Sequence, residues 1–255
     1  MARELDAAVA AAKAAGGILR SGFGGEQSVR YKGEVDPVTA LDERAEEEIG
    51  GILGEAFPGY GMLAEEGGES PGEGENRWIV DPIDGTVNFA HGLPVFCVSI
   101  ALEKAGDLVL GVVHDPMSDE TFVAERGRGA TLNGRPIRVS DTDTLIRALV
   151  ATGFPYDRDA MPSALDLFGR FAPLSQGMRR LGSAALDVCY VAAGRFDAYY
   201  ERGVRAWDIA AGVLILEEAG GKASDFRGDP LDLEGPEIVA TNSTLHPAVV
   251  AVTGG

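Results

Sequence analysis

One stretch of this chain, residues 78–89, brings two carboxylates to the end of a buried strand. The residues before Asp81 are apolar and read as a strand, and Asp84 follows three positions later. Like charges held this close repel, unless a cation lies between them or a proton neutralises one. Pro82 has no backbone N–H, so we expect the chain to turn there. The pattern points to a divalent metal with oxygen ligands, and to phosphate as the group that the metal holds.

Asp84 also fits a second explanation, as the N-cap of a helix. Gly85 and Thr86 follow it and read as the first helical positions. Capping accounts for Asp84 but not for Asp81, so we favour metal binding for the pair. The N–H groups of Gly85 and Thr86 at this helix start are suited to hold a phosphate.

Two further acids lie at comparable places. Glu65, with Glu66 beside it, ends an apolar strand, where an uncompensated charge would be costly; an exposed loop acid is the alternative. Asp208 follows Trp207 at the entry of an apolar helix, where it is again a possible N-cap.

These motifs carry a resemblance to a known family. Residues 64–66, 81–89 and 207–212 resemble the three motifs of the inositol monophosphatase family, whose members are Mg²⁺-dependent, lithium-sensitive phosphomonoesterases. Motif order and spacing fit, and the resemblance covers nearly the whole chain. Ala64 stands where the family usually has Gly or Ser, a departure that removes no ligand. The resemblance implies an α/β (α+β) fold, a layered αβαβα sandwich with mixed, largely antiparallel sheets.

The resemblance also implies a set of metal ligands. They are Glu65, Asp81, the Ile83 carbonyl, Asp84 and Asp208. Asp81 would bridge two metals, the Ile83 carbonyl would join the first, and Asp84 and Asp208 would complete the second. Two or three Mg²⁺ are expected, with Li⁺ as an inhibitor and Ca²⁺ or Mn²⁺ as possible substitutes.

Catalytic residues follow from the same resemblance. They are Asp42, Thr86 and Glu65, with Gly85 and Thr86 as phosphate-binding residues. A Thr hydroxyl that is hydrogen-bonded to a carboxylate orients and partly deprotonates a metal-activated water. From the residues alone, Asp42 is one acid on an acidic helix, and Lys32 is either an anion-binding residue or an exposed lysine.

Substrate contacts are implied at Asp84, Ser183, Ala184, Glu201 and Asp208, whose counterparts in the family meet the hydroxyls of the leaving alcohol. Glu201 is suited to accept hydrogen bonds from a polyol; a surface acid is the equal alternative.

The resulting hypothesis is hydrolysis of inositol monophosphate by a metal-activated water, without a phosphoenzyme. Fructose-1,6-bisphosphate, histidinol phosphate and 3′-phosphoadenosine 5′-phosphate are alternative substrates, and basic residues near the leaving-group pocket would favour a second phosphate. A non-enzymatic regulator that keeps the metal site is the rival from another class. The resemblance further implies a homodimer.

Composition excludes several classes. A net charge of −18 over 255 residues argues against nucleic-acid binding, which needs a basic face. No apolar run of about 18 residues is present, so we expect no membrane span, and the start reads as a helix rather than a signal peptide. Cys97 and Cys189 read as reduced core residues of a cytoplasmic protein.

Periodicity and turn residues predict one unit, residues 1–255, with an N-terminal half (1–145) that carries the main metal motifs and a C-terminal α/β half (146–255). We predict helices at residues 5–19, 39–57, 161–171, 183–193, 206–219 and from about 244. We predict strands at residues 28–32, 59–64, 96–103, 108–114, 121–125, 130–139, 147–152, 176–180, 195–200, 222–224 and 238–240. Residues 67–76 read as a surface loop.

Overall fold

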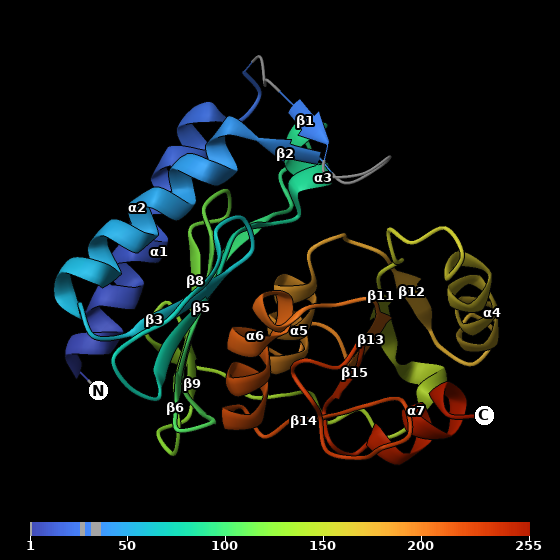
Figure 1. The fold of residues 1–255 in the computed structure, drawn as a ribbon. Helices are drawn as coiled ribbons and strands as arrows, with labels where there is room; N and C mark the ends of the chain where they lie inside the picture. The colour runs from blue at the N-terminus through green and yellow to red at the C-terminus, as the bar shows by residue number, and fades with distance from the viewer. Residues whose placement is uncertain (1, 26–28, 32–36) are drawn as a thin grey trace.

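The computed structural model describes residues 2–25, 29–31 and 37–255, and these form five layers in the order α, β, α, β, α (Figure 1). The predicted αβαβα sandwich is therefore confirmed. Its helices are α1 (Ala2–Gly22), α2 (Ala40–Ala56), α3 (Thr86–Ala90), α4 (Met161–Phe171), α5 (Ala184–Ala192), α6 (Ala206–Glu218) and α7 (His246–Thr253), with a 3-10 turn η1 (Leu145–Arg147). None of these described helices has the length and apolar character that crossing a bilayer requires.

The first sheet has eight strands in the order β10-β9-β8-β7-β6-β5-β3-β4. They are β3 (Gly61–Ala64), β4 (Gly68–Ser70), β5 (Asn76–Asp84), β6 (Cys97–Lys104), β7 (Asp107–Asp115), β8 (Glu120–Glu125), β9 (Ala130–Leu132) and β10 (Arg135–Pro136). Only β3 and β5 pair in parallel; the other neighbours are antiparallel, as the short turns predict. The loop predicted at residues 67–76 is partly wrong, because β4 pairs there with β3.

The second sheet has five strands in the order β12-β11-β13-β15-β14. They are β11 (Leu149–Thr152), β12 (Gly177–Arg179), β13 (Ala198–Arg202), β14 (Lys222–Ser224) and β15 (Glu237–Thr241). Strand β11 pairs in parallel with both of its neighbours, and β15 is antiparallel to both of its own. A small third sheet joins β1 (Val29–Tyr31) to β2 (Pro37–Thr39).

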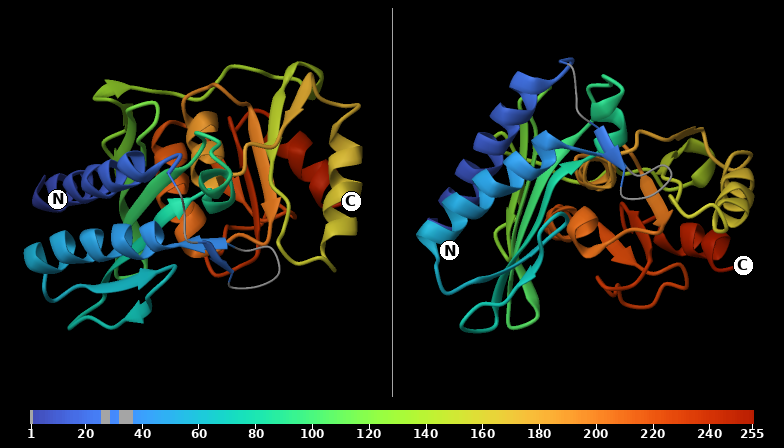
Figure 2. Two further views of the ribbon diagram at one scale, coloured as in Figure 1. Left: turned by 90° about the horizontal axis from the view of Figure 1, so that it is seen from above. Right: turned by 45° about the horizontal axis from the view of Figure 1, so that its top comes forward.

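The apolar pattern of each helix fits the layer in which it lies. Helices α1 and α2 cover one face of the first sheet, α5 and α6 lie between the sheets, and α4 and α7 lie on the far side of the second sheet (Figures 1 and 2). A helix of a middle layer meets a sheet on both sides, so it needs apolar residues all round. Helix α6 meets this demand, because every residue from Ile209 to Leu216 is buried.

Strand β5 corrects one prediction. Pro82 was expected to end the strand at Asp81, yet β5 continues to Asp84. The pairing with β6 shifts register between Asp81 and Asp84, which is a bulge or a similar irregularity. A bulge leaves ladder groups unpaired, so it tolerates the missing N–H of proline. The irregularity brings Asp81 and Asp84 to the same end of the sheet.

A close approach between the middle helical layer and the first sheet depends on one glycine. A Cβ placed on Gly111 of β7 would lie 2.6 Å from the carbonyl oxygen of Ala211 and 3.1 Å from its Cα. Both atoms belong to the backbone of α6 and cannot rotate away. Any side chain at this position would therefore push α6 off the sheet.

We predict that Gly111→Ala destabilises the protein by about 1–3 kcal/mol, the usual cost of overpacking a core. Gly51→Ala is the matched control, because Gly51 is exposed on α2 with no heavy atom within 4 Å of an added Cβ. Alanine favours helix over glycine by up to about 1 kcal/mol, so this control should be neutral or stabilising. Urea denaturation of both variants measures the difference, and equal midpoints would contradict the tight contact.

Candidate active site

Nearly all predicted site residues line one cavity of about 90 Å³, which we call the carboxylate cavity. The predicted residues on its wall are Glu65, Asp81, Ile83, Asp84, Gly85, Thr86, Ser183, Ala184, Glu201 and Asp208. Asp42 is buried on α2 and reaches the group through Thr86. Lys32 lies outside the described residues.

Four separate elements supply the acids of this cavity. Glu65 directly follows β3, and its N–H donates to the carbonyl of Val80 on the parallel neighbour β5 at 3.2 Å. Asp81 and Asp84 come from β5 itself. Asp208 arrives on α6 and Glu201 on β13, from the other half of the chain. The pairing of β3 with β5 thus brings the first two motifs together.

Asp84 caps a helix, but not the one that follows it in sequence. The N-cap of α3 is Gly85 rather than Asp84. The Asp84 carboxylate instead accepts hydrogen bonds from the start of α5: the Ser183 hydroxyl at 2.7 Å, the Ala185 N–H at 2.7 Å and the Ala184 N–H at 3.2 Å. Asp84 therefore caps a helix, as the alternative predicted. The helix is α5, however, which begins about a hundred residues further along the chain.

Asp208 also occupies a different position from the predicted N-cap. The N-cap of α6 is Arg205, and Asp208 is the third helical residue, with its Oδ2 accepting the Arg205 N–H at 2.7 Å. An acid at this position reaches back to the free backbone N–H of the first turn. This bond orients the Asp208 carboxylate along the cavity wall.

Gly85 and Thr86 form a tight turn beside the acids. Gly85 has φ of 105°, and a Cβ there would lie 2.9 Å from the Val95 carbonyl, so only glycine fits without strain. The Thr86 Oγ1 lies 3.2 Å from Asp42 Oδ1 and 2.9 Å from the Ile83 carbonyl oxygen. A hydroxyl has one proton, so it can donate fully to only one of these acceptors at a time.

Burial raises the pKa of the acids in this cavity, and neighbouring negative charges add to the effect for two of them. Burial raises the pKa of Asp81 well above its usual range, and the negative charge of Glu65 adds to the effect, followed by those of Asp84 and Asp208. Burial is also the main cause of the raised pKa of Asp208, with Asp84 next. For Asp84, burial raises the pKa while the donors on α5 oppose it. The hydrogen-bond donors around these carboxylates therefore do not offset all of the negative charge that the carboxylates carry when ionised.

A hard divalent cation fits this donor set. Carboxylate and carbonyl oxygens are the ligands that Mg²⁺ and Ca²⁺ take, and a cation would relieve the repulsion among the acids. Among the described residues, no three His, Cys, Asp or Glu side chains already converge closely enough to enclose one ion. Each carboxylate has about four lone-pair sites, so Asp84 keeps acceptor capacity beyond its three strong bonds.

Sequence reasoning missed one wall of the cavity. Residues 153–156, Arg180 and residues 203–204 also line it. The available signal was the Gly153-Phe154-Pro155 turn directly after a predicted strand. Burial raises the pKa of Glu201 to about 7, and the positive charge of Arg180 opposes this rise.

Asp187 is a further buried acid that the motifs did not indicate. It lies on α5, is only 1% exposed, and its Oδ1 has no hydrogen-bond partner in the described part of the chain. Burial raises its pKa well above the usual range, and the charges of Glu201 and Asp84 add to this. The signal in the sequence was an acid within the apolar run of residues 184–192.

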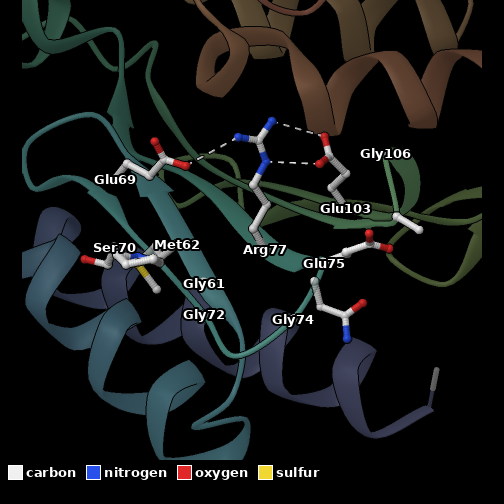
Figure 3. A pocket seen from close by; sticks show the side chains of 13 residues that line it. Gly61, Met62, Glu69, Ser70, Gly72, Gly74, Glu75, Arg77, Glu103 and Gly106 are labelled. Carbon is white, nitrogen blue, oxygen red and sulfur yellow. Dashed lines mark hydrogen bonds and ion pairs between the residues drawn. The ribbon is translucent and has the colours of Figure 1, made fainter.

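The described residues also line larger hollows outside the carboxylate cavity. A cleft of about 750 Å³ adjoins it and shares Glu65, Tyr156 and Asp208. A separate cavity of about 400 Å³ lies at the β3–β4 end of the first sheet (Figure 3). There Arg77 donates to Glu103 at 3.0 and 3.3 Å, and Figure 3 draws its contact with Glu69. These contacts tie β4, β5 and β6 together, and the cavity includes none of the predicted site residues among its described lining.

The chain is similar to known proteins over almost its full length. The sequence profile of the Inositol monophosphatase family matches residues 1–254. The inositol-1-monophosphatase of Mesorhizobium japonicum is 46% identical over 251 residues, covering 96% of this chain and 94% of the relative. The Nus factor SuhB of Pseudomonas aeruginosa is 46% identical over 229 residues, covering 88% and 84%. The crystal structure of extragenic suppressor protein suhB from Bartonella henselae has a TM-score of 0.94 at 41% identity, covering 97% of each chain.

We predict that Asp187→Asn stabilises the protein increasingly as the pH rises above 3.8, the ordinary pKa of Asp. The folded wild type keeps the Asp187 proton at pH values where the unfolded chain has released it, so its stability falls with rising pH. Asparagine has no such proton to lose. Urea midpoints between pH 4.5 and 8 measure the effect, with Asp166→Asn on α4 as the exposed control. Parallel curves for the wild type and Asp187→Asn would refute the prediction.

Proposed function

Because this chain belongs to the inositol monophosphatase family and is a phosphomonoesterase of that type, we propose that it hydrolyses inositol monophosphate to inositol and phosphate, with Mg²⁺ as its cofactor. One observation carries the proposal: acids from both halves of the chain meet in a single cavity, where burial and the charges of the other acids raise the pKa of Asp81. We treat the chain as one functional unit for the same reason. Neither half holds the whole set of acids.

The metal ligands of the proposal are Glu65, Asp81, the Ile83 carbonyl, Asp84 and Asp208. Bound Mg²⁺ would stabilise negative charge on the phosphate and its leaving oxygen and lower the pKa of the attacking water. Hydrogen bonds from backbone N–H groups orient three of these side chains. Asp81 Oδ1 accepts the Ile83 N–H at 2.9 Å, Asp84 accepts the Ala185 N–H, and Asp208 accepts the Arg205 N–H. Gly85 and Thr86 offer backbone N–H groups to the phosphate.

Asp42 and Thr86 are the proposed proton acceptors, with Glu65 beside them. A cation held by the Ile83 carbonyl would leave Asp42 as the remaining acceptor of the Thr86 proton. The Thr86 oxygen then turns a lone pair toward the water and receives its proton while Asp42 takes up the proton of Thr86. Asp42 is fully buried, so its contact with Thr86 is shielded from solvent.

Ser183, Ala184 and Glu201 are the proposed contacts of the leaving alcohol, together with Asp84 and Asp208. Glu201 supports a polyol, because a carboxylate accepts hydrogen bonds from neighbouring hydroxyls. Arg180 on the same wall favours a second candidate, a substrate whose leaving group carries another phosphate, such as fructose-1,6-bisphosphate.

A regulatory role is the other candidate, and it rests on the names of relatives. A protein 46% identical to this chain is named Nus factor SuhB, so a role through protein contact is compatible with this sequence. The five acids of the cavity do not require such a role. Assays of turnover and of metal binding separate the two candidates.

We predict Mg²⁺-dependent phosphate release that is fastest with inositol 1-phosphate, slower with fructose-1,6-bisphosphate, histidinol phosphate and 3′-phosphoadenosine 5′-phosphate, and inhibited by Li⁺ or a chelator. Asp81→Asn should lower kcat/KM by more than about 100-fold. Loss of a residue that only orients a metal ligand typically costs about 10–100-fold. This variant keeps an oxygen for the Ile83 N–H, so it tests charge rather than folding. A folded wild type that binds Mg²⁺ without turnover of any substrate would favour the regulatory role.

We predict that Thr86→Val lowers kcat by about 10²–10⁴-fold, the range of a positioned proton acceptor, while Thr86→Ser keeps most of it. Asp42→Asn should fall in the same range. The double variant should lose little more than either single one, because the two residues act on one proton. Additive losses in the rate measurements would show that Thr86 and Asp42 act separately.

A further inference from the structure

The wall of the carboxylate cavity that carries Glu201 has a built-in hydrogen bond. The Tyr199 hydroxyl donates to Glu201 Oε2 at 2.5 Å, from two residues earlier on β13. A charge-assisted bond of this length is among the strong ones. Glu201 Oε1 accepts no hydrogen bond from the described residues, while Glu201 borders the cavity.

Gly153, which has no side chain, completes the arrangement. Gly153 follows β11, which pairs in parallel with β13, and a Cβ on it would overlap the Glu201 carboxylate. The carboxylate therefore occupies the space that a side chain at residue 153 would fill. Tyr199 holds one oxygen while Gly153 leaves room for the group.

The Tyr199 hydroxyl keeps its proton in this place. Burial raises the pKa of Tyr199 well above its usual range, and the negative charge of Glu201 raises it further, followed by that of Asp187. Tyr199 thus stays protonated and donates the hydrogen bond to Glu201. The other groups that act on the pKa of Glu201 are Arg180, which lowers it, and Asp84, which raises it.

We propose that Tyr199 and Gly153 are positioning residues for the leaving group: they hold the Glu201 carboxylate so that its unbonded oxygen accepts hydrogen bonds from the hydroxyls of a polyol. This inference rests on the proposed function for the role of Glu201 and adds what sets its orientation. It predicts selectivity for leaving groups that carry hydroxyls, with no part for Tyr199 in the attack on phosphorus. Loss of the bond should therefore weaken the binding of a polyol phosphate and spare other monoesters.

The chain offers a matched control in the next residue. Tyr200 lies on the opposite face of β13, where its buried ring stacks on Phe171. Tyr199→Phe and Tyr200→Phe remove the same atom from the two faces of one strand. A merely structural effect would appear in both.

We expect Tyr199→Phe to raise the KM for inositol 1-phosphate by about 5-fold, the equivalent of one hydrogen bond of about 1 kcal/mol, with kcat little changed. The kcat/KM for 4-nitrophenyl phosphate, whose leaving group has no other hydroxyl, should stay within about 2-fold, and Tyr200→Phe should change neither substrate. Gly153→Ala should reproduce the selective loss. Equal losses on both substrates, or no loss, would overturn the inference.

A second measurement does not depend on turnover. Because the Tyr199 hydroxyl lowers the pKa of Glu201, its removal should raise that pKa above about 7, as followed by NMR of protein labelled with ¹³C in the glutamate carboxyls. An unchanged Glu201 pKa in Tyr199→Phe overturns the inference even if the wild type fails to hydrolyse inositol 1-phosphate. A raised pKa with no such hydrolysis supports the positioning contact and rejects the proposed substrate.

Discussion

The carboxylate of Asp84 joins the two halves of this molecule. It ends strand β5 of the first sheet and accepts three hydrogen bonds from the start of α5, which lies between the sheets. A buried carboxylate is costly unless such donors surround it, so this contact fixes how the end of β5 meets α5. The cavity exists because the contact brings Ser183 and Ala184 to the acids of β5.

Charge, rather than apolar packing, distinguishes this cavity from the rest of the interior. The surrounding layers follow ordinary rules: α6 is buried on all sides, and Gly111 lets it approach β7 closely. Within that frame, burial raises the pKa of Asp81 and Asp208, and the negative charge of Asp84 raises both further. A bound cation would offset this charge, so the arrangement that costs stability in its absence is also the one suited to hold it.

The wall around Glu201 follows a different logic. The neutral hydroxyl of Tyr199 donates to the Glu201 carboxylate, and Gly153 leaves the space that the carboxylate fills. Arg180 lowers the pKa of Glu201, which burial raises. Under the proposed function, the reaction centre thus depends on clustered charge, and the leaving-group wall depends on shape and one hydrogen bond.

Most of the elements and most of the candidate site residues could be predicted from the amino-acid sequence. Periods of 2 and 3.6 and the turn residues predicted most helices and strands, though not β2 or β4, and three short motifs named four of the acids that line the carboxylate cavity. The contacts of those acids depend on the tertiary structure. Asp84 caps α5 rather than α3, β5 continues past Pro82, Gly153 lines the cavity, and Tyr199 reaches it through Glu201. The reason is physical: local pattern reflects backbone preference over a few residues, whereas hydrogen bonds and charges act between groups that only the packed layers bring together.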